Sequence, residues 1–221
     1  MPGSNRENQM ERAEHVFLPA LPGQKIIAIT GTIGSGKSTV AKILASRYPV
    51  IDCDRVNAEL LLPGSRAYDA LRALPFVKVD DQGQIDKPAM AKAIFGDASK
   101  KAAVEGILHP RIFERVQAWI LEQQAPVVFV EMPVLFEIGA ECRFKTIWCV
   151  TCDEDVALQR LMEQRHFSRE DAKARIASQW DARKKKAGST VVIDNSASRQ
   201  ALQTKVAALM ERLEASEKRE N

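Results

Sequence analysis

The stretch KIIAITGTIGSGKST, residues 25–39, decides the fold. Residues 26–29 form a continuous apolar run of strand length, which predicts a parallel strand buried on both faces. The glycines that follow let the backbone turn its N–H groups toward an anion. Residues 31–38 satisfy the pattern G-x-x-x-x-G-K-[ST], and residues 39–47 are expected to form a helix whose N-terminus faces the anion. The stretch therefore predicts a P-loop that binds a nucleoside triphosphate.

Individual residues of this loop have expected tasks. Lys37 is expected to reach the β- and γ-phosphates, and the hydroxyl of Ser38 is expected to ligate Mg²⁺. A chance match to the full pattern in such a chain has a probability on the order of one per cent, so a plain glycine-rich turn is a poor alternative. The expected ATP-binding residues of the loop are Gly34, Ser35, Gly36, Lys37, Ser38 and Thr39.

The composition is typical of a globular protein. Of the 221 residues, 45% are hydrophobic and 28% are charged, and no apolar run approaches the roughly 20 residues of a membrane span. The net charge of +3, from 32 basic and 29 acidic residues, is too balanced to indicate a nucleic-acid binder. Residues 1–24 lack the pattern of a secretory signal. We therefore expect a cytoplasmic protein with small-molecule partners and no membrane or nucleic-acid partner.

The four cysteines include a C-x-x-C motif, Cys149 to Cys152, that invites a zinc or redox interpretation. Residues 146–151 are predicted to form a strand, on which positions three apart point to opposite faces, so the two thiols are poorly placed to share a metal. We expect these cysteines, together with Cys53 and Cys142, to be buried free thiols in a reducing compartment.

Acidic residues follow two predicted strands. Asp52 and Asp54 come after the strand at residues 50–51, where ligands bind in open α/β sheets. Asp54 is expected to carry chemistry, while Asp52 either caps the next helix or assists a metal-bound water. The strand at 127–130 ends in Glu131, which resembles a Walker B acid with one extra methylene, so water-mediated metal contact is expected.

About seventy residues separate the second and third strands, far more than the dozen that a βαβ crossover needs. Their pattern is mainly helical, and helices are expected from Asp86 to Phe95 and from His109 to Gln124. These residues are expected to form an insertion that holds a second substrate. His109 either contacts a substrate phosphate or caps its helix.

Two helices are expected after the fourth strand, the second of them capped by Ser168. Arginines on such a hairpin can approach a transferring phosphoryl group when a lid closes. The basic run at 183–186 is expected to be a solvated helix face. The remaining chain is expected to form a strand at 191–193, a helix at 198–213 and a frayed end at 214–221.

In combination, these features resemble the dephospho-CoA kinase family of coenzyme A biosynthesis. The resemblance covers residues 25–213. Its motifs are, in chain order, TGTIGSGKST (30–39), Asp52-Cys53-Asp54, LLPGS (61–65), GQID (83–86), IF (94–95), ILHP (107–110), PVLFE (133–137), Arg175-Ile176 with Gln179, and VIDN (192–195). The P-loop alone is shared with many protein families, whereas the combination is specific.

The resemblance implies an α/β, three-layer P-loop kinase fold with a five-stranded parallel sheet, a helical substrate-binding insertion and a helical lid. A flexible N-terminal extension is expected at residues 1–24, before a single domain at 25–221. The expected parts of that domain are a core at 25–54, 126–152 and 187–214, a CoA-binding insertion at 55–125, and a lid at 153–186.

The resemblance also implies transfer of the γ-phosphoryl group of ATP, with Mg²⁺, to the ribose 3′-hydroxyl of dephospho-CoA. Asp54 matches the family's general base, Lys37 its phosphate-binding lysine and Arg160 its lid arginine. Asn195 matches a position near the adenine of ATP. We expect a monomer or a weak homo-oligomer.

Three positions depart from the family pattern. Ala58 stands where an arginine is usual, Glu131 replaces an aspartate, and Gln164 occupies the place of a second lid arginine. Arg165 follows one place later, which rotates it by about 100° on a helix. The alternatives are another small-molecule or nucleotide kinase, such as a shikimate-type kinase, and a non-catalytic nucleotide sensor. A GTPase is disfavoured because the sequence has no N-K-x-D tetrapeptide.

Overall fold

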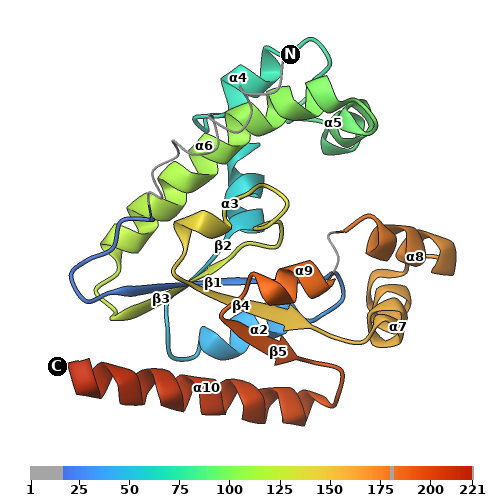
Figure 1. Ribbon diagram of the computed structural model, residues 1–221. Helices are drawn as coiled ribbons and strands as arrows, with labels where there is room; N and C mark the ends of the chain where they lie inside the picture. Colours follow the sequence, from blue (N-terminus) through green and yellow to red (C-terminus); the bar gives the residue numbers. More distant parts are fainter. Residues whose placement is uncertain (1–16, 180–181, 221) are drawn as a thin grey trace, which may run out of the picture. The chain divides into compact units, whose positions relative to one another are not determined.

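The computed structural model describes residues 17–179 and 182–220 (Figure 1). Within these ranges, five strands form one sheet in the order β2-β3-β1-β4-β5, and β1 pairs in parallel with β3 and β4. The strands are β1 (Lys25–Gly31), β2 (Val50–Asp52), β3 (Val127–Glu131), β4 (Thr146–Thr151) and β5 (Val191–Asp194). The predicted α/β class with a five-stranded parallel sheet is confirmed.

The chain divides into two compact units, Met1–Val50 with Gln123–Asn221, and Ile51–Glu122. The first unit contains the helices α2 (Lys37–Leu44), η1 (Glu141–Arg143), α7 (Glu154–Arg165), α8 (Arg169–Ala177), α9 (Ala182–Ala187) and α10 (Arg199–Glu220). The second contains α3 (Cys53–Leu60), α4 (Tyr68–Arg72), α5 (Lys87–Ile94) and α6 (Ala98–Glu122). The predicted insertion, residues 55–125, covers most of the second unit.

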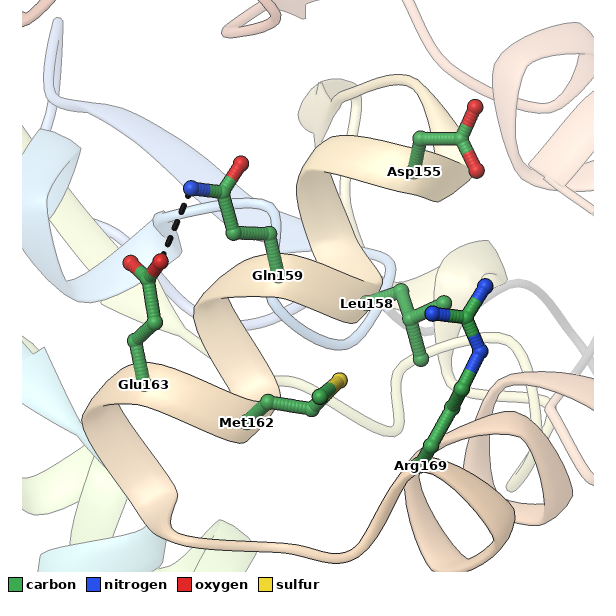
Figure 2. Close-up of a pocket in the computed structure, with 6 residues that line it drawn as sticks. All are labelled: Asp155, Leu158, Gln159, Met162, Glu163 and Arg169. Carbon is green, nitrogen blue, oxygen red and sulfur yellow. Dashed lines mark hydrogen bonds between the residues drawn. The ribbon is translucent and has the colours of Figure 1, made fainter.

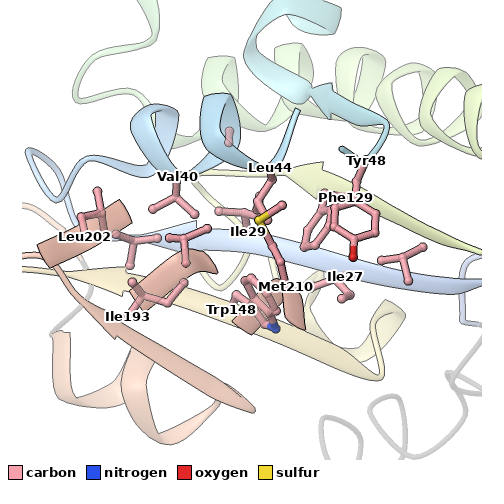
Figure 3. Close-up of a cluster of buried hydrophobic side chains, with 14 residues drawn as sticks. Ile27, Ile29, Val40, Leu44, Tyr48, Phe129, Trp148, Ile193, Leu202 and Met210 are labelled. Atoms are coloured by element: carbon pink, nitrogen blue, oxygen red, sulfur yellow. The ribbon is translucent and has the colours of Figure 1, made fainter. Parts of the chain in front are cut away.

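The core of the first unit lies between the sheet and helices α2 and α10 (Figure 3). The ring of Phe129 on β3 makes edge-on contacts with Tyr48 and Trp148, with centroids 5.5 and 5.3 Å apart. The central strands carry apolar side chains on both faces, as expected for strands that are covered on both sides. Because the strands are parallel, their carboxyl ends lie at one edge of the sheet, where the P-loop begins.

Helix α6 is longer than the helix that the sequence predicted in this part of the second unit. The expected helix start at His109 is wrong, because α6 runs without interruption from Ala98 to Glu122 and passes through Pro110. Proline removes one helical hydrogen bond, but buried side chains precede and follow it, among them Leu108 and Val116. Their packing keeps one helix. His109 lies inside α6 and therefore does not cap a helix.

Two further expectations are wrong. Helix α10 continues to Glu220, so residues 214–220 are not frayed; Glu214 pairs with Arg47 at 3.1 Å, and Ser216 accepts a hydrogen bond from Lys25. The basic run lies on α9, where Lys185 is fully buried and the other three residues are exposed. A uniformly solvated face at 183–186 is therefore wrong.

The described part of the expected N-terminal extension packs on the first unit. Leu18 is buried, and its N–H donates to the carbonyl of Arg143 at 3.1 Å. The ammonium of Lys145 lies 5.1 Å from the centre of the Phe17 ring. The expectation for residues 1–16 lies outside the described residues. No helix in the described ranges combines the length and apolarity needed to cross a membrane.

All four cysteines lie in the described ranges and are free thiols, as predicted. Cys53 and Cys149 are buried and Cys152 is half-buried. Cys142 is exposed on η1, so its predicted burial is wrong. Burial raises the pKa values of the Cys149 and Cys152 thiols and so makes both thiols harder to ionise.

Thiol labelling tests this arrangement. At pH 8 a thiol reagent should modify Cys142 first and Cys152 more slowly, because exposure and thiolate fraction set the rate. Cys53 and Cys149 should react only after unfolding in denaturant. The measurement is the time course of reagent consumption in native and denatured protein. The variant Cys142→Ser should lose the fast phase, and a fast phase that survives in that variant would contradict the assignment.

Candidate functional site

The P-loop joins β1 to α2 through backbone geometry that demands glycine at two positions. A Cβ at Gly31 would overlap the carbonyl oxygen of Val150, and one at Gly36 would overlap the side-chain nitrogen of Asn195. Gly36 is also the N-cap of α2, with φ +88° in the left-handed region. Both neighbours therefore press directly on the loop, and a larger residue at either position would push the loop out of place.

The P-loop lysine is the first residue of α2, and its ammonium folds back over the loop. Lys37 Nζ donates to the carbonyl oxygens of Gly31 at 3.2 Å and Thr32 at 2.8 Å. A positive charge is thus held at the N-terminal end of a helix, where the helix dipole also favours an anion. Ser38 is exposed in the same first turn, and Thr39 follows it, half-buried.

Two side chains from other elements hold carbonyls of the loop. Asn195, just after β5, is buried, and its Nδ2 donates to Ser35 O at 2.7 Å. Arg160 on α7 donates to Gly34 O at 3.3 Å and to Asn195 O at 3.0 Å. Because the C=O and N–H of a trans peptide point in opposite directions, the Asn195 contact turns the N–H of Gly36 away from Asn195. The structure therefore brings Lys37, Arg160, Asn195 and residues 34–36 together.

The end of β5 is itself fixed by a small polar network. Asp194 accepts a hydrogen bond from the Ser196 hydroxyl at 2.6 Å, and Ser196 Oγ accepts the N–H of Asp153 at 2.9 Å. Lys205 on α10 donates to the Asp194 carbonyl at 2.7 Å. The Ser196 hydroxyl and then Lys205 lower the pKa of Asp194. This network sets the position from which Asn195 reaches the loop.

Gln179 is a site residue whose contact the sequence did not predict. Its side-chain oxygen accepts the N–H of Ile33, inside the P-loop, at 2.7 Å. The N–H groups of a P-loop are those that meet phosphate oxygens, so Gln179 holds one of them from the segment that follows α8. Gln179 was part of the family motif Arg175-Ile176 with Gln179, but that motif did not indicate which residue the side chain contacts.

Asp52 and Asp54 lie in the second unit, at the start of α3. The carboxylate of Asp52 accepts the N–H groups of Asp54 at 2.8 Å and Arg55 at 3.4 Å, so the capping role proposed for Asp52 is confirmed. Asp54 is exposed in the first turn. Near Ala58, the guanidinium of Arg55 lies 3.6 Å from a carboxylate oxygen of Glu59, four residues later.

Glu131, the predicted Walker B acid, ends β3 and is 8% exposed. In the parallel sheet it pairs with Ile29, two residues before the P-loop. Glu131 therefore lies at the same edge of the sheet as the start of the P-loop. Among the described residues, no group of three or more acidic, histidine or cysteine side chains is placed to hold a metal.

A separate hollow lies on α7 and the start of α8 (Figure 2). Its volume is about 290 Å³, just below the roughly 300 to 1,000 Å³ of small-molecule pockets. On α7, the side chain of Gln159 donates a hydrogen bond to that of Glu163 at 2.8 Å. The side chain of Arg169 points toward Leu158. None of the residues that line it belongs to the P-loop, so this hollow is not the phosphate site.

Comparisons with known proteins agree with this geometry. The dephospho-CoA kinase family model matches residues 25–201. A dephospho-CoA kinase of Moorella thermoacetica is 38% identical over 196 residues, which are 86% of this chain and 92% of that protein. One from Nostoc is 37% identical over 81% of this chain and 93% of that protein.

Solved structures show the same fold. TT1252 from Thermus thermophilus superposes with a TM-score of 0.76 at 33% identity, over 86% of this chain and 98% of that one. The dephospho-CoA kinase of Campylobacter jejuni, at 21% identity and a TM-score of 0.59, covers 86% of this chain and 97% of its own and shares the fold. The chain belongs to the dephospho-CoA kinase family.

Proposed function

We propose that this protein transfers the γ-phosphoryl group of ATP to the ribose 3′-hydroxyl of dephospho-CoA and so forms coenzyme A. The observation that carries the proposal is a complete P-loop in a chain of this family, with the ammonium of Lys37 in contact with the loop. Relatives of nearly the same extent are named dephospho-CoA kinases. The acceptor is inferred from that membership, and ATP binding also has support from the loop itself.

Phosphoryl transfer needs positioning and charge neutralisation more than covalent chemistry from the protein. In the proposed mechanism the N–H groups of residues 34–39 and the ammonium of Lys37 bind the β- and γ-phosphates. The guanidinium of Arg160 contacts the carbonyl of Gly34 in the loop and adds a second positive charge. Asn195 is assigned to the adenine side of the site because it matches that position of the family, and its Nδ2 also holds the carbonyl of Ser35 in the loop.

We assign Mg²⁺ to the hydroxyl of Ser38, with Glu131 acting through water. Hydroxyl and carboxylate oxygens are the donors that Mg²⁺ prefers, and this ion commonly keeps waters and substrate phosphates as its other ligands. The residues present therefore fit the ion even though they form no cage. When bound, Mg²⁺ supplies positive charge to the β- and γ-phosphate oxygens.

We assign the role of general base to Asp54. Asp52 already caps α3, so the carboxylate of Asp54 is not needed for that purpose. In this role it would orient the 3′-hydroxyl and accept its proton as the phosphoryl group transfers. Residues 55–125 are proposed to bind dephospho-CoA, and residues 153–186, which include Arg160 and Gln179, are proposed to form the lid.

An acceptor screen tests the function. Purified protein with Mg²⁺ and ATP should release ADP with dephospho-CoA and far less with AMP or shikimate, and the product should match coenzyme A by mass. ADP release is followed in a coupled assay. Faster turnover of AMP or shikimate would indicate another kinase. ATP binding without turnover of any acceptor would indicate a nucleotide sensor.

Replacement of Asp54 tests the base. Asp54→Asn should lower kcat by roughly two to four orders of magnitude, since it removes the proton acceptor, while ATP affinity stays unchanged. The matched control is Asp52→Asn, because asparagine caps a helix as well as aspartate does and should leave kcat within a few-fold of the wild type. Equal turnover of the Asp54 variant and the wild type would refute the assignment.

Replacement of Asn195 tests the support of the P-loop. Asn195→Asp keeps the shape but sets an oxygen against Ser35 O in place of a donor, so the Kd for ATP should rise about ten- to hundred-fold. Calorimetry with a non-hydrolysable ATP analogue measures this change. Gln203→Glu, which adds the same charge on the exposed face of α10, should bind as the wild type does. Unaltered affinity in Asn195→Asp would contradict the role.

A further inference from the structure

Lys185 on α9 is a buried lysine that the proposed mechanism does not use. Its side chain is fully buried, whereas the rest of the basic run at 183–186 is exposed. A buried ammonium is stable only with a counter-charge and hydrogen-bond acceptors. Its Nζ lies 2.6 Å from the Oε1 of Glu137, in the turn that follows β3. The ion pair therefore ties α9 to that turn.

The backbone around Lys185 is closely held. Its carbonyl accepts the hydroxyl of Ser189 at 2.7 Å, and a Cβ at Gly188 would overlap the ring of Phe136. Helix α9 also packs on β4. The backbone that carries Lys185 is therefore packed against Phe136 and β4, unlike the backbone of a lysine on a mobile surface loop.

Lys185 and the P-loop lysine share one acceptor. Lys185 Nζ lies 3.5 Å from Gly31 O, and Lys37 Nζ lies 3.2 Å from the same oxygen. Lys37 also donates to Thr32 O at 2.8 Å. Gly31 is buried and is the first residue of the loop. Two ammonium groups from different elements thus meet at the carbonyl where β1 turns into the P-loop.

We propose that Lys185, held by Glu137, is a positioning residue for ATP binding and phosphoryl transfer. To reach the β- and γ-phosphates, Lys37 must turn away from the carbonyls that it contacts in this structure. A buried carbonyl that loses its donor is unfavourable. Lys185 keeps a donor on Gly31 O when Lys37 leaves, so the entrance of the loop stays in place and Lys37 is released at lower cost.

This role predicts an effect on ATP more than on the acceptor. The inference rests on the proposed function for its turnover measurements, while its binding measurement does not. Lys185→Met should raise the Kd and the KM for ATP about ten-fold, which corresponds to the loss of one net hydrogen bond. The KM for dephospho-CoA should stay unchanged. Lys185→Arg keeps a charged donor and should recover most of the affinity.

The matched control is Lys186→Met, which removes an exposed ammonium from the next position of the same helix. It should bind ATP and turn over as the wild type does. The measurements are calorimetry with a non-hydrolysable ATP analogue, steady-state kinetics with each substrate varied, and thermal unfolding of each variant.

A double variant separates positioning from simple stability. Lys185→Met alone leaves the carboxylate of Glu137 without its lysine, and the other oxygen of that carboxylate is buried without a hydrogen-bond partner among the described residues. The Tm of the single variant should therefore fall. Lys185→Met with Glu137→Met replaces the whole pair by apolar groups, which is often neutral for stability, and should restore the Tm.

The ATP affinity of the double variant distinguishes a positioning role of Lys185 from a purely structural one. If Lys185 positions the loop, the Kd for ATP stays about ten-fold raised although the Tm has recovered. If the affinity recovers with the Tm, Lys185 is only structural and the inference is wrong. Because the analogue needs no acceptor, this result stands whether or not dephospho-CoA is turned over, so the inference and the proposed function fail separately.

Discussion

The carbonyl oxygens of the P-loop need hydrogen-bond donors from outside the anion site, and this requirement brings several elements of the first unit together at the loop. An anion site made of N–H groups works only if the neighbouring carbonyls are satisfied elsewhere. The donors from outside the loop come from α7, α9 and the end of β5; they are Arg160, Lys185 and Asn195. The conformation of the loop therefore depends on contacts with segments that are distant from it in the sequence.

The same constraint connects the sheet to the segment proposed as the lid. Gln179 contacts the N–H of Ile33, and Lys185 contacts the carbonyl of Gly31, so two side chains from one stretch reach two neighbouring points of the loop. Arg160 reaches a third point from α7. Side chains of α7 and α9 are therefore in direct contact with the loop.

Local features of the fold were predictable because they depend on residues that are close in sequence. The cap at Asp52, the cap at Ser168 and the strand β4 were expected and observed, since each needs only its own few neighbours. Helix α6 was divided wrongly at Pro110 because the packing that carries the helix past proline involves residues distant from it.

The P-loop and the parallel sheet could be predicted from the sequence alone, because glycine spacing and apolar runs act through local backbone geometry. The combination of motifs along the chain indicated the family. Which polar groups are buried could be learned only from the folded structure. Lys185 and its exposed neighbours are indistinguishable as a run of basic residues, and Cys142 looks like the other thiols. Their burial or exposure follows from contacts between segments far apart in the chain, such as Lys185 with Glu137 and Asn195 with Ser35.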